Sequence, residues 1–350
     1  MPNEVSLALL GCGAVTRQCH LPAAMDLPQV RIAALVDSDI KRADTLRRSF
    51  GLDCTVTSDY KTVLAYVEGI VNALPNNLHV PVTLDALQSG RHVLCEKPLA
   101  LTAASARTCC EAADEKGLVL ALGMQMRFHP NQRVLRLAAD EGLLGAITGY
   151  DWEYGAAWEW DTSSGFYFSR TKAGGGVLID FGVHLLDRLI DWFGPIEQLE
   201  YQDDNWGGGI EANASLDLTH NGRYGRVNGH LRLSRTYTLK NRLLVKGTKA
   251  DAEVRVGVAD VDSVELHSRI GGQNIKMTMA FADRPVSGPI QCYVDQLSNF
   301  IESIRGAQKP LVDGWQGLPT LKVIGECYAR AKRIPEPWAE LEGASTGVHA

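Results

Sequence analysis

The 350-residue sequence predicts an α/β fold in two domains: first a doubly wound parallel sheet, then an α+β domain with a large, mainly antiparallel open sheet. Up to residue 123, short apolar runs alternate with helix-length segments, which is typical of a parallel sheet. From 196 to 281, β-rich runs alternate between Gly, Asn and Asp turns, which is typical of an antiparallel sheet with one covered face. We expect domains at 1–124 and 125–335 and a C-terminal tail at 336–350.

The chain begins with a strand, a glycine-rich turn and a helix. Val5 to Leu10 is the strand, and Gly11-Cys12-Gly13-Ala14-Val15 leads into a helix that ends at about Met25. Gly11 permits a tight turn, Gly13 lets the backbone approach a pyrophosphate, and the helix N-terminus offers free N–H groups. Thr16 occupies the third glycine position of the fingerprint. An ordinary strand–helix turn is therefore the alternative.

The second predicted strand, Val30 to Val36, ends at Asp37. An acidic residue there can accept hydrogen bonds from the adenosine ribose hydroxyls, and its charge repels a 2′-phosphate. NAD is therefore the favoured cofactor, while Lys41 and Arg42 leave NADP as an alternative. Because a helix follows, Asp37 is alternatively a helix N-terminal carboxylate.

The alternation continues through the first domain. We expect helices at 59–67, 77–89 and 102–116 and strands at 69–74, 92–95 and 118–123. Ligands of such sheets bind beyond the carboxyl ends of the strands. Two strand ends carry polar residues, Leu74-Pro75-Asn76-Asn77-Leu78-His79 and Cys95-Glu96-Lys97-Pro98. Pro98 biases Lys97 to an extended backbone, so this lysine has a defined direction and is a candidate functional residue.

Three glycines at 174–176 precede an apolar helix that we expect to end near Phe193. At about 100° per residue, its polar residues fall in one stripe. These residues are Asp180, His184, Asp187, Arg188 and Asp191. The stripe is a solvated face, half of a metal site, or an acid/base pair beside a substrate. We assign Asp187, Arg188 and Asp191 to the solvated face, and no metal is expected because further ligands at suitable spacing are missing.

An aromatic run from Trp152 to Phe168 precedes the glycines and includes Trp158 and Tyr167. It is either a packed corner or subunit contact, or a set of aromatic walls beside the apolar face of a sugar. Arg170 and Lys172 follow it. These cations either meet an anionic group of a substrate or are surface charges.

Composition excludes several classes of protein. The net charge is −6 and no basic block appears, so nucleic acid is not an expected partner. No apolar run reaches the roughly 18 residues of a membrane span, and no signal peptide is recognisable. The eight cysteines form no Cys-x-x-Cys pair. Buried free thiols are therefore expected, which favours a cytoplasmic protein.

These motifs together resemble the Gfo/Idh/MocA family of NAD(P)-dependent sugar and cyclitol oxidoreductases. The resemblance rests on the following segments, in this order: Gly11–Val15, Asp37, Pro75–His79, Glu96–Pro98, Arg127-Phe128-His129-Pro130 and Gly174–Asp187. Glu-Lys-Pro combined with Gly-Gly-Gly-x-x-x-Asp-x-Gly-x-His is the specific part. The resemblance implies a Rossmann domain followed by a domain with a large open sheet. Thr16 departs from the family pattern, as does Gln125, where many members carry Asn.

The resemblance also implies roles for individual residues. The implied catalytic residues are Lys97, Asp180 and His184. The implied cofactor-binding residues are Gly11, Gly13, Ala14, Val15, Asp37, Leu74, Pro75, Asn76, His79, Glu96, Lys97 and Gln125. The implied substrate-binding residues are Lys97, Arg127, Trp158, Tyr167, Arg170, Asp180 and His184.

The implied reaction is hydride transfer between the nicotinamide and a carbinol or keto carbon of a sugar, sugar derivative or cyclitol. His184 is the favoured base because of the near-neutral reference pKa of histidine, and Lys97 is the alternative. Other readings are a keto-sugar or other carbonyl reductase, a redox-neutral NAD-dependent hydrolase or eliminase, and a sugar- or NAD-sensing regulator. The expected partners are a sugar-like small molecule and further copies of the chain, in a homodimer or homotetramer formed through the C-terminal sheet.

Overall fold

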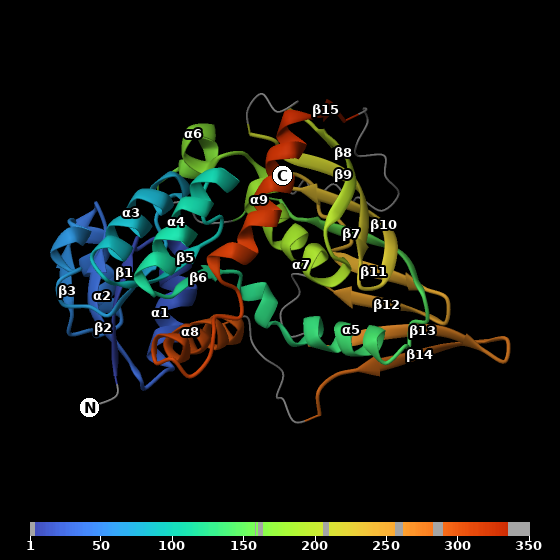
Figure 1. The fold of residues 1–350 in the computed structure, drawn as a ribbon, viewed down its shortest axis with the longest axis horizontal. Helices are drawn as coiled ribbons and strands as arrows, with labels where there is room; N and C mark the ends of the chain where they lie inside the picture. The colour runs from blue at the N-terminus through green and yellow to red at the C-terminus, as the bar shows by residue number, and fades with distance from the viewer. Residues whose placement is uncertain are drawn as a thin grey trace, which may run out of the picture. The chain divides into compact units, whose positions relative to one another are not determined.

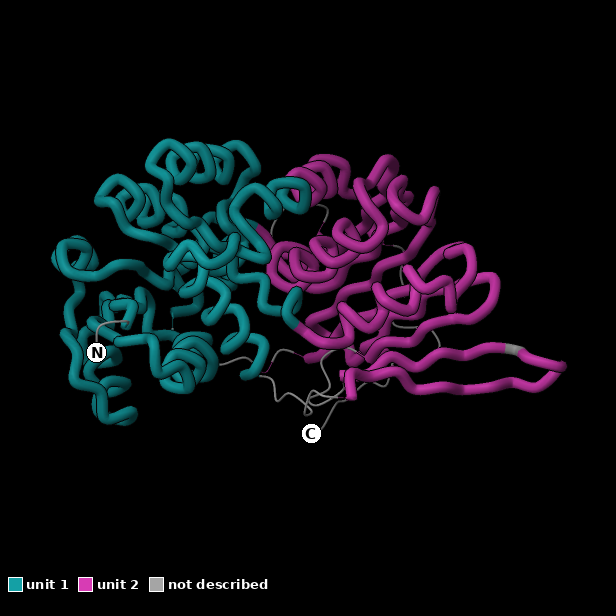
Figure 2. Tube along the Cα trace, turned by 60° about the horizontal axis from the view of Figure 1, so that its bottom comes forward, with its two compact units in different colours: residues 1–128, 160–174, 290–321 teal, residues 129–159, 175–289, 322–350 magenta. Residues whose placement is uncertain are grey.

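The computed structural model describes residues 4–157, 159, 164–205, 210–255, 262–282 and 290–334. The chain forms two compact units, which Figure 2 colours separately. The first unit contains residues 1–128, 160–174 and 290–321, and the second contains 129–159, 175–289 and 322–350. The predicted division near residue 124 places residues 160–174 and 290–321 in the second domain, whereas in the structure they belong to the first unit.

The first unit is built on a parallel six-stranded sheet in the order β3-β2-β1-β4-β5-β6 (Figure 1). Its strands are β1 (Val5–Leu10), β2 (Val30–Val36), β3 (Thr55–Thr57), β4 (Gly69–Asn72), β5 (His92–Glu96) and β6 (Leu120–Gly123). Every residue of β1 and β4 is buried, as strands covered on both faces require. The strand order reverses beside β1, and doubly wound sheets bind ligands at that point. The predicted parallel sheet is confirmed.

The helices of the first unit follow the predicted alternation. They are α1 (Leu21–Met25), α2 (Ile40–Ser49), α3 (Asn76–Gln88), α4 (Ala103–Lys116), α6 (Arg170–Ala173) and α8 (Gln291–Ile304), with π-helical η1 (Thr16–His20) and the 3₁₀ turns η2 (Tyr60–Thr62), η3 (Gln125–Phe128) and η4 (Phe166–Phe168). A further helix, α9 (Gly314–Ala329), begins in the first unit and ends in the second.

The helix predicted at 59–67 is wrong, because only the 3₁₀ turn η2 forms there. Val63, Leu64 and Val67 are buried, so the segment has the apolar spacing of a helix without continuing as one. The short edge strand β3 was not predicted. Its three residues are exposed or partly exposed, and they therefore lack the apolar pattern that identified the other strands.

The second unit is built on a nine-stranded sheet in the order β14-β13-β12-β11-β7-β10-β9-β8-β15. Its strands are β7 (Ile147–Gly155), β8 (Ile196–Asp203), β9 (Asn213–Gly222), β10 (Gly225–Ser234), β11 (Arg242–Gly247), β12 (Ala250–Arg255), β13 (Val264–Ile270), β14 (Gln273–Met279) and β15 (Lys332–Arg333). Neighbouring strands are antiparallel except in the β7–β10 and β8–β15 pairs. The predicted mainly antiparallel sheet is confirmed.

Helices cover one face of this sheet (Figure 1). They are α5 (Pro130–Asp140) and α7 (Val183–Phe193), the latter preceded by a π-helical turn, η5 (Leu178–Gly182). On β9, Ala214, Leu216 and Leu218 are buried, whereas Asp217 between them is exposed. This alternation shows that the apolar face packs under the helices and that the polar face points away from them.

All eight cysteines are free thiols, and six of them are buried. Burial raises the pKa of the Cys12, Cys109, Cys110 and Cys327 thiols to about 12. These thiols are therefore protonated and unreactive near neutral pH. Among the described helices, none combines the length and the apolar character needed to cross a bilayer.

Candidate functional site

The glycine-rich turn after β1 has the geometry that a close backbone approach demands. Gly11 has a φ of 89°, and a Cβ there would lie 2.5 Å from the carbonyl oxygen of Ala73. Gly13, Ala14 and Val15 are partly exposed at the start of the following helix. Buried Thr16 donates its hydroxyl hydrogen to the Gly11 carbonyl, so the residue in the third glycine position fastens the turn from within.

Asp37 lies at the carboxyl end of β2 and is 5% exposed. It accepts hydrogen bonds from the backbone N–H groups of Cys12 (2.8 Å) and Asp39 (2.9 Å). The helix that follows is capped by Asp39, whose carboxylate accepts from the N–H groups of Lys41 and Arg42. Asp37 therefore fastens the glycine turn to the next strand end, and the alternative role of helix cap belongs to Asp39.

Lys97 directly follows β5 and is partly exposed. Its backbone N–H donates to one carboxylate oxygen of Glu96 (3.1 Å), and the other oxygen lies 2.7 Å from Nε2 of His20. Burial alone would raise the pKa of Glu96, but the hydrogen bond from His20 and the charge of Lys97 hold this pKa below its ordinary value. Glu96 is therefore an ionised, buried anchor for the backbone of Lys97. His20 was missed by sequence reasoning, since a lone histidine on a helix gives no signal.

Asn76 and His79 are engaged with the protein backbone. The Asn76 amide donates to the Ala173 carbonyl (2.8 Å), and the two ring nitrogens of His79 each lie 2.7 Å from a carbonyl oxygen, of Pro98 and of Leu74. Burial lowers the pKa of His79. The side chains thus shape the loop around partly exposed Leu74 and Pro75. Their predicted contact with a cofactor stays a prediction.

Gln125 provides a test of whether these residues fit a dinucleotide. Its side-chain oxygen is buried and has no hydrogen-bond partner among the described residues. A buried acceptor left without a donor is costly, so a ligand N–H group at this point is stabilising. A nicotinamide carboxamide offers such a donor. With the glycine turn and Asp37 at the same edge of the sheet, the residues fit the cofactor.

In the second unit, a buried carboxylate fixes the start of the helix that carries Asp180 and His184. Glu211 is 1% exposed and accepts hydrogen bonds from Gly176 N–H (2.9 Å), Leu178 N–H (2.9 Å) and the Tyr328 hydroxyl (2.8 Å). Burial raises the pKa of Glu211, and these hydrogen bonds oppose the rise. Sequence reasoning missed both Glu211 and Tyr328, because neither belongs to a recognisable motif.

The same contacts explain the glycines. A Cβ on Gly175 would lie 2.0 Å from the Tyr328 hydroxyl oxygen, and a Cβ on Gly176 would lie 2.0 Å from the Glu211 carbonyl oxygen. Gly174 has a φ of 93° where α6 ends. Close packing therefore requires glycine at 175 and 176, and the left-handed backbone requires it at 174.

Asp180 forms an ion pair with Arg235, whose guanidinium carbon lies 3.6 Å from the centre of the Phe181 ring. Both charged side chains are largely buried. His184 is 3% exposed and lies one turn further along the helix. Asp180 lies in the π-helical turn η5, a feature that is frequent at functional sites. Arg235 follows β10 and carried no signal in the sequence.

The assignment of Asp187 and Arg188 to a solvated face is wrong, because each is 2% exposed. The Arg188 guanidinium carbon lies 4.9 Å from the ring centres of both Trp152 and Trp192. A helical wheel shows that polar residues share a stripe, but it does not show what packs against them. Here Trp152 and Trp192 pack against Arg188, and the cation–π contacts stabilise its buried charge.

The predicted substrate-binding residues lie in different surroundings. Arg127 is partly buried in η3, and Tyr167 contacts Phe166 with ring centres 4.0 Å apart. Arg170 is exposed at the start of α6. Trp158 lies outside the described residues. Among the residues that the structure describes, no three His, Cys, Asp or Glu side chains gather as metal ligands would.

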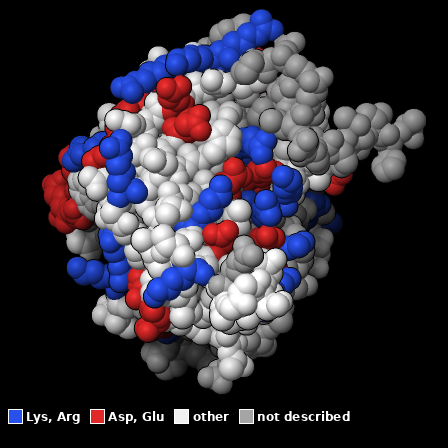
Figure 3. Space-filling model, turned by 90° about the vertical axis from the view of Figure 1, so that its right-hand side faces the viewer, with Lys and Arg blue, Asp and Glu red and all other residues white. Residues whose placement is uncertain are grey.

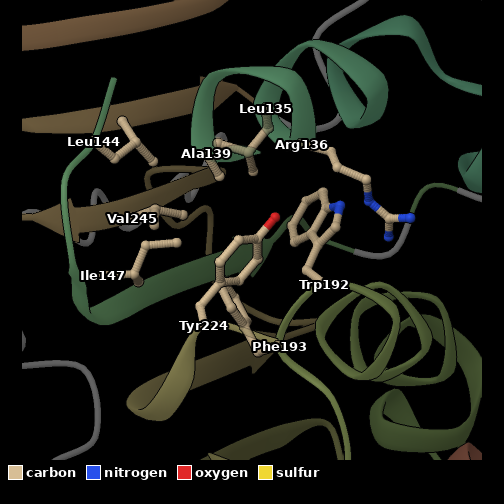
Figure 4. A pocket seen from close by; sticks show the side chains of 9 residues that line it. All are labelled: Leu135, Arg136, Ala139, Leu144, Ile147, Trp192, Phe193, Tyr224 and Val245. Atoms are coloured by element: carbon tan, nitrogen blue, oxygen red, sulfur yellow. The ribbon is translucent and has the colours of Figure 1, made fainter. Parts of the chain in front are cut away.

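A small pocket of the second unit lies between α5, α7 and the sheet (Figure 4). Its lining is mostly apolar and includes Leu135, Ile147 and Val245. The polar groups at its edge are engaged elsewhere: Arg136 pairs with Asp191, and the Tyr224 hydroxyl donates to Asp140 (2.6 Å). Polar groups that converge on a ligand mark a binding site, so we interpret this pocket as a packing gap.

Comparison with known protein families gives two matches. Residues 5–124 match the oxidoreductase family with an NAD-binding Rossmann fold that is named GFO_IDH_MocA. Residues 133–253 match the GFO/IDH/MocA C-terminal domain. The first match includes all six strands of the parallel sheet, and the second includes the strands of the nine-stranded sheet from β7 to β11 and most of β12.

Relatives include a D-glucoside 3-dehydrogenase of Escherichia coli, 33% identical over 190 residues, which are 53% of this chain and 53% of the relative. The match therefore spans about half of that relative's length. A D-apiose dehydrogenase of Paraburkholderia graminis is 26% identical over 93% of this chain and 87% of its own. Among solved structures, aldose-aldose oxidoreductase from Caulobacter crescentus has a TM-score of 0.80 at 24% identity and covers 93% of this chain and 97% of its own. At this identity the likeness shows the fold.

Proposed function

The chain belongs to the Gfo/Idh/MocA oxidoreductase family, and from this premise we propose that it is an NAD(P)-dependent oxidoreductase of a sugar, sugar derivative or cyclitol. The observation that carries the proposal is the edge of the parallel sheet where β1, β2 and β5 end. The glycine turn, Asp37 and Glu96-Lys97 all lie at these strand ends. Doubly wound sheets bind dinucleotides there.

The reaction that we propose oxidises a carbinol carbon or, in reverse, reduces the ketone. A bound NAD would supply the hydride acceptor for this oxidation, held by the glycine turn after β1. His184 takes the hydroxyl proton, and Asp180 holds a neighbouring substrate hydroxyl while Arg235 keeps its carboxylate in place. Lys97 stabilises the developing negative charge on the substrate oxygen with its ammonium group. Glu96 orients Lys97 by accepting its backbone N–H.

Replacement of Lys97, Asp180 and His184 by Ala, one at a time, tests these roles. The protein is first titrated with NADH and NADPH by fluorescence, and a panel of sugars and cyclitols is then screened for formation of reduced nucleotide. We expect each variant to bind nucleotide and to lose about 10²–10⁴ in turnover, the usual value of acid–base assistance. Lys116→Ala, at an exposed lysine that ends α4, is the matched control.

Two results would redirect the proposal. Near-normal turnover in all three variants would remove these residues from the site. A nucleotide that stays bound through purification, with substrate consumed and no net NADH formed, would favour a redox-neutral hydrolase or eliminase.

We also propose that the chain forms a homodimer or homotetramer through the polar face of its nine-stranded sheet. Charges of both signs meet on this face: Glu153 pairs with Arg232, and Arg242 pairs with Glu253 (3.2 Å). Figure 3 shows positive and negative side chains side by side on the face that it views. A face that carries both charges can place unlike charges opposite each other about a two-fold axis, and salt weakens such contacts. Light scattering should show dissociation as salt is raised, and a single protomer at low salt would contradict this assembly.

A further inference from the structure

The carboxylate of Asp37 already accepts hydrogen bonds from protein groups at all of its acceptor positions. Besides the two backbone N–H groups of Cys12 and Asp39, it accepts from Nη1 of Arg42, which lies 3.0 Å from one carboxylate oxygen and 3.2 Å from the other. A carboxylate offers about four lone-pair sites. All four are occupied, so a ribose hydroxyl can bind Asp37 only by displacing one of these donors.

Arg42 is the donor that can leave. The N–H groups of Cys12 and Asp39 belong to the backbone of the glycine turn and of the start of α2, whereas Arg42 reaches Asp37 with a flexible side chain that is 30% exposed. A second, weaker partner, Asp39, lies 3.5 Å from its Nη2 atom. Ser38, Asp39 and Ile40 beside the pair are exposed, so a ligand can reach the guanidinium.

The pair also changes the electrostatic argument for NAD. An isolated Asp37 would repel a 2′-phosphate, but a guanidinium in contact with both oxygens compensates its charge. A phosphate matches the planar fork of arginine with two parallel hydrogen bonds. The arrangement therefore disfavours the bare ribose and favours the phosphorylated one.

We propose that Arg42 is the residue that sets the choice between NAD and NADP, so that this chain accepts NADP. Arg42 competes with the ribose hydroxyls of NAD for Asp37, and it turns to the 2′-phosphate when NADP binds. This inference rests on the proposed nucleotide-binding function and goes further than it, because it names the side chain that discriminates between the two cofactors.

The test is the binding of NADH and NADPH to the full chain, followed by nucleotide fluorescence. Arg42→Ala should weaken NADPH binding about 10- to 100-fold, as the loss of hydrogen bonds to a charged group does, and should leave NADH binding unchanged or tighter. Arg42→Lys keeps the charge without the fork and should lie between. Arg47→Ala is the matched control, since Arg47 lies on the same helix, is 34% exposed and pairs with Asp44. Thermal melting of each variant checks that it is folded.

Three results would overturn the inference, and they are distinguishable. A wild-type chain that binds NADH but not NADPH shows that Arg42 yields to the ribose hydroxyls and does not bind a 2′-phosphate. Equal loss of both nucleotides in Arg42→Ala shows that Arg42 contributes no discrimination. A folded wild-type chain that binds neither nucleotide removes the proposed function itself.

Discussion

His220 shows how a buried histidine of this protein is satisfied in its neutral form. It is 0% exposed on β9, with Nδ1 2.9 Å from the Gly194 carbonyl oxygen and Nε2 2.9 Å from the Tyr150 hydroxyl. Burial lowers its pKa, although the bond to Gly194 opposes the shift. The neutral ring therefore donates to Gly194 and accepts from Tyr150, and a second proton would have no acceptor at Tyr150 unless that hydroxyl turned.

We predict that His220 makes stability fall as the pH drops below about 6.5, the ordinary pKa of histidine. The unfolded chain binds a proton there while the folded chain resists it, so acid favours unfolding until the lowered folded pKa is passed. Above this range the residue contributes no pH dependence. Melting temperatures between pH 7.5 and 5.5 should fall less steeply in His220→Gln than in the wild type. His267→Gln, at a side chain that is 41% exposed, is the control, and equal slopes would contradict the prediction.

In the His20–Glu96 contact, the folded protein favours the charged form of the titrating group, whereas at His220 it favours the neutral form. Glu96 has a lowered pKa, so its contribution to stability is present above about pH 4.5 and is lost as the pH falls through the folded value. His20→Ala removes the donor from a buried carboxylate and should cost about 1–3 kcal/mol at pH 7.

Urea unfolding at pH 7 and at pH 4 measures this cost. The difference between His20→Ala and the wild type should shrink at the lower pH, because the variant lacks the contact that lowers the Glu96 pKa and takes up a proton there more readily than the wild type. His20→Gln keeps an N–H donor and should recover part of the loss. A deficit that is the same at both pH values would indicate that packing against Tyr293, whose ring meets that of His20 edge-on at 5.3 Å, is what matters.

At the scale of elements, the glycine-led helix shows what the sequence can predict. Periodicity and the Gly-Gly-Gly signal predicted its position and its polar stripe. Its first turn is held by the Glu211 carboxylate, which lies 33 positions from its partner Leu178. The Tyr328 hydroxyl that donates to Glu211 lies a further 117 positions along the chain. Contacts of this kind depend on the tertiary fold, and no local pattern encodes them.

The difference between local patterns and tertiary contacts also explains which other parts of the fold were predictable. All strands of the parallel sheet except β3 were predicted, because their residues are mostly apolar and buried, as in β1. Strand β14 lies within the β-rich stretch predicted at 196–281, but its own bounds were not predicted because its residues are exposed or partly exposed and have no clear apolar alternation. Within the candidate site, Lys97, Asp180 and His184 follow motifs, whereas His20 and Arg235 are recognisable only by what they contact.

Gly176→Ala should destabilise the protein, because its Cβ would lie 2.0 Å from the Glu211 carbonyl oxygen and the backbone would have to move. Overpacking of this kind costs about 1–3 kcal/mol. Gly325→Ala is the matched control: this glycine is exposed on α9 with open space around it, and alanine there should stabilise by about 0.5–1 kcal/mol. Urea unfolding of both variants decides, and a Gly176→Ala protein as stable as the wild type would show that the turn adapts.

At the scale of the whole molecule, the chain completes its first unit late. Residues 290–321 belong to the first unit, although they follow all strands of the nine-stranded sheet except β15 in the sequence. Three residues of α8, Leu297, Phe300 and Ile301, are at most 1% exposed and belong to the same core as Leu7 and Leu9 of β1. The parallel sheet therefore depends on a helix nearly 300 residues downstream of its first strand.

A fragment of residues 1–128 should consequently fail to fold cooperatively. Burial of the three α8 side chains stabilises by about 1.5–3 kcal/mol each, which together approaches the roughly 5–15 kcal/mol that holds an entire domain folded. Joining residues 290–321 to the fragment through a Gly/Ser linker should restore a cooperative urea transition, followed by circular dichroism. The same fusion with Leu297→Asn, Phe300→Asn and Ile301→Asn has the same length and should not restore it. If the 1–128 fragment alone unfolds in a sharp transition, the core that α8 completes is not required, and the first unit is an independent domain.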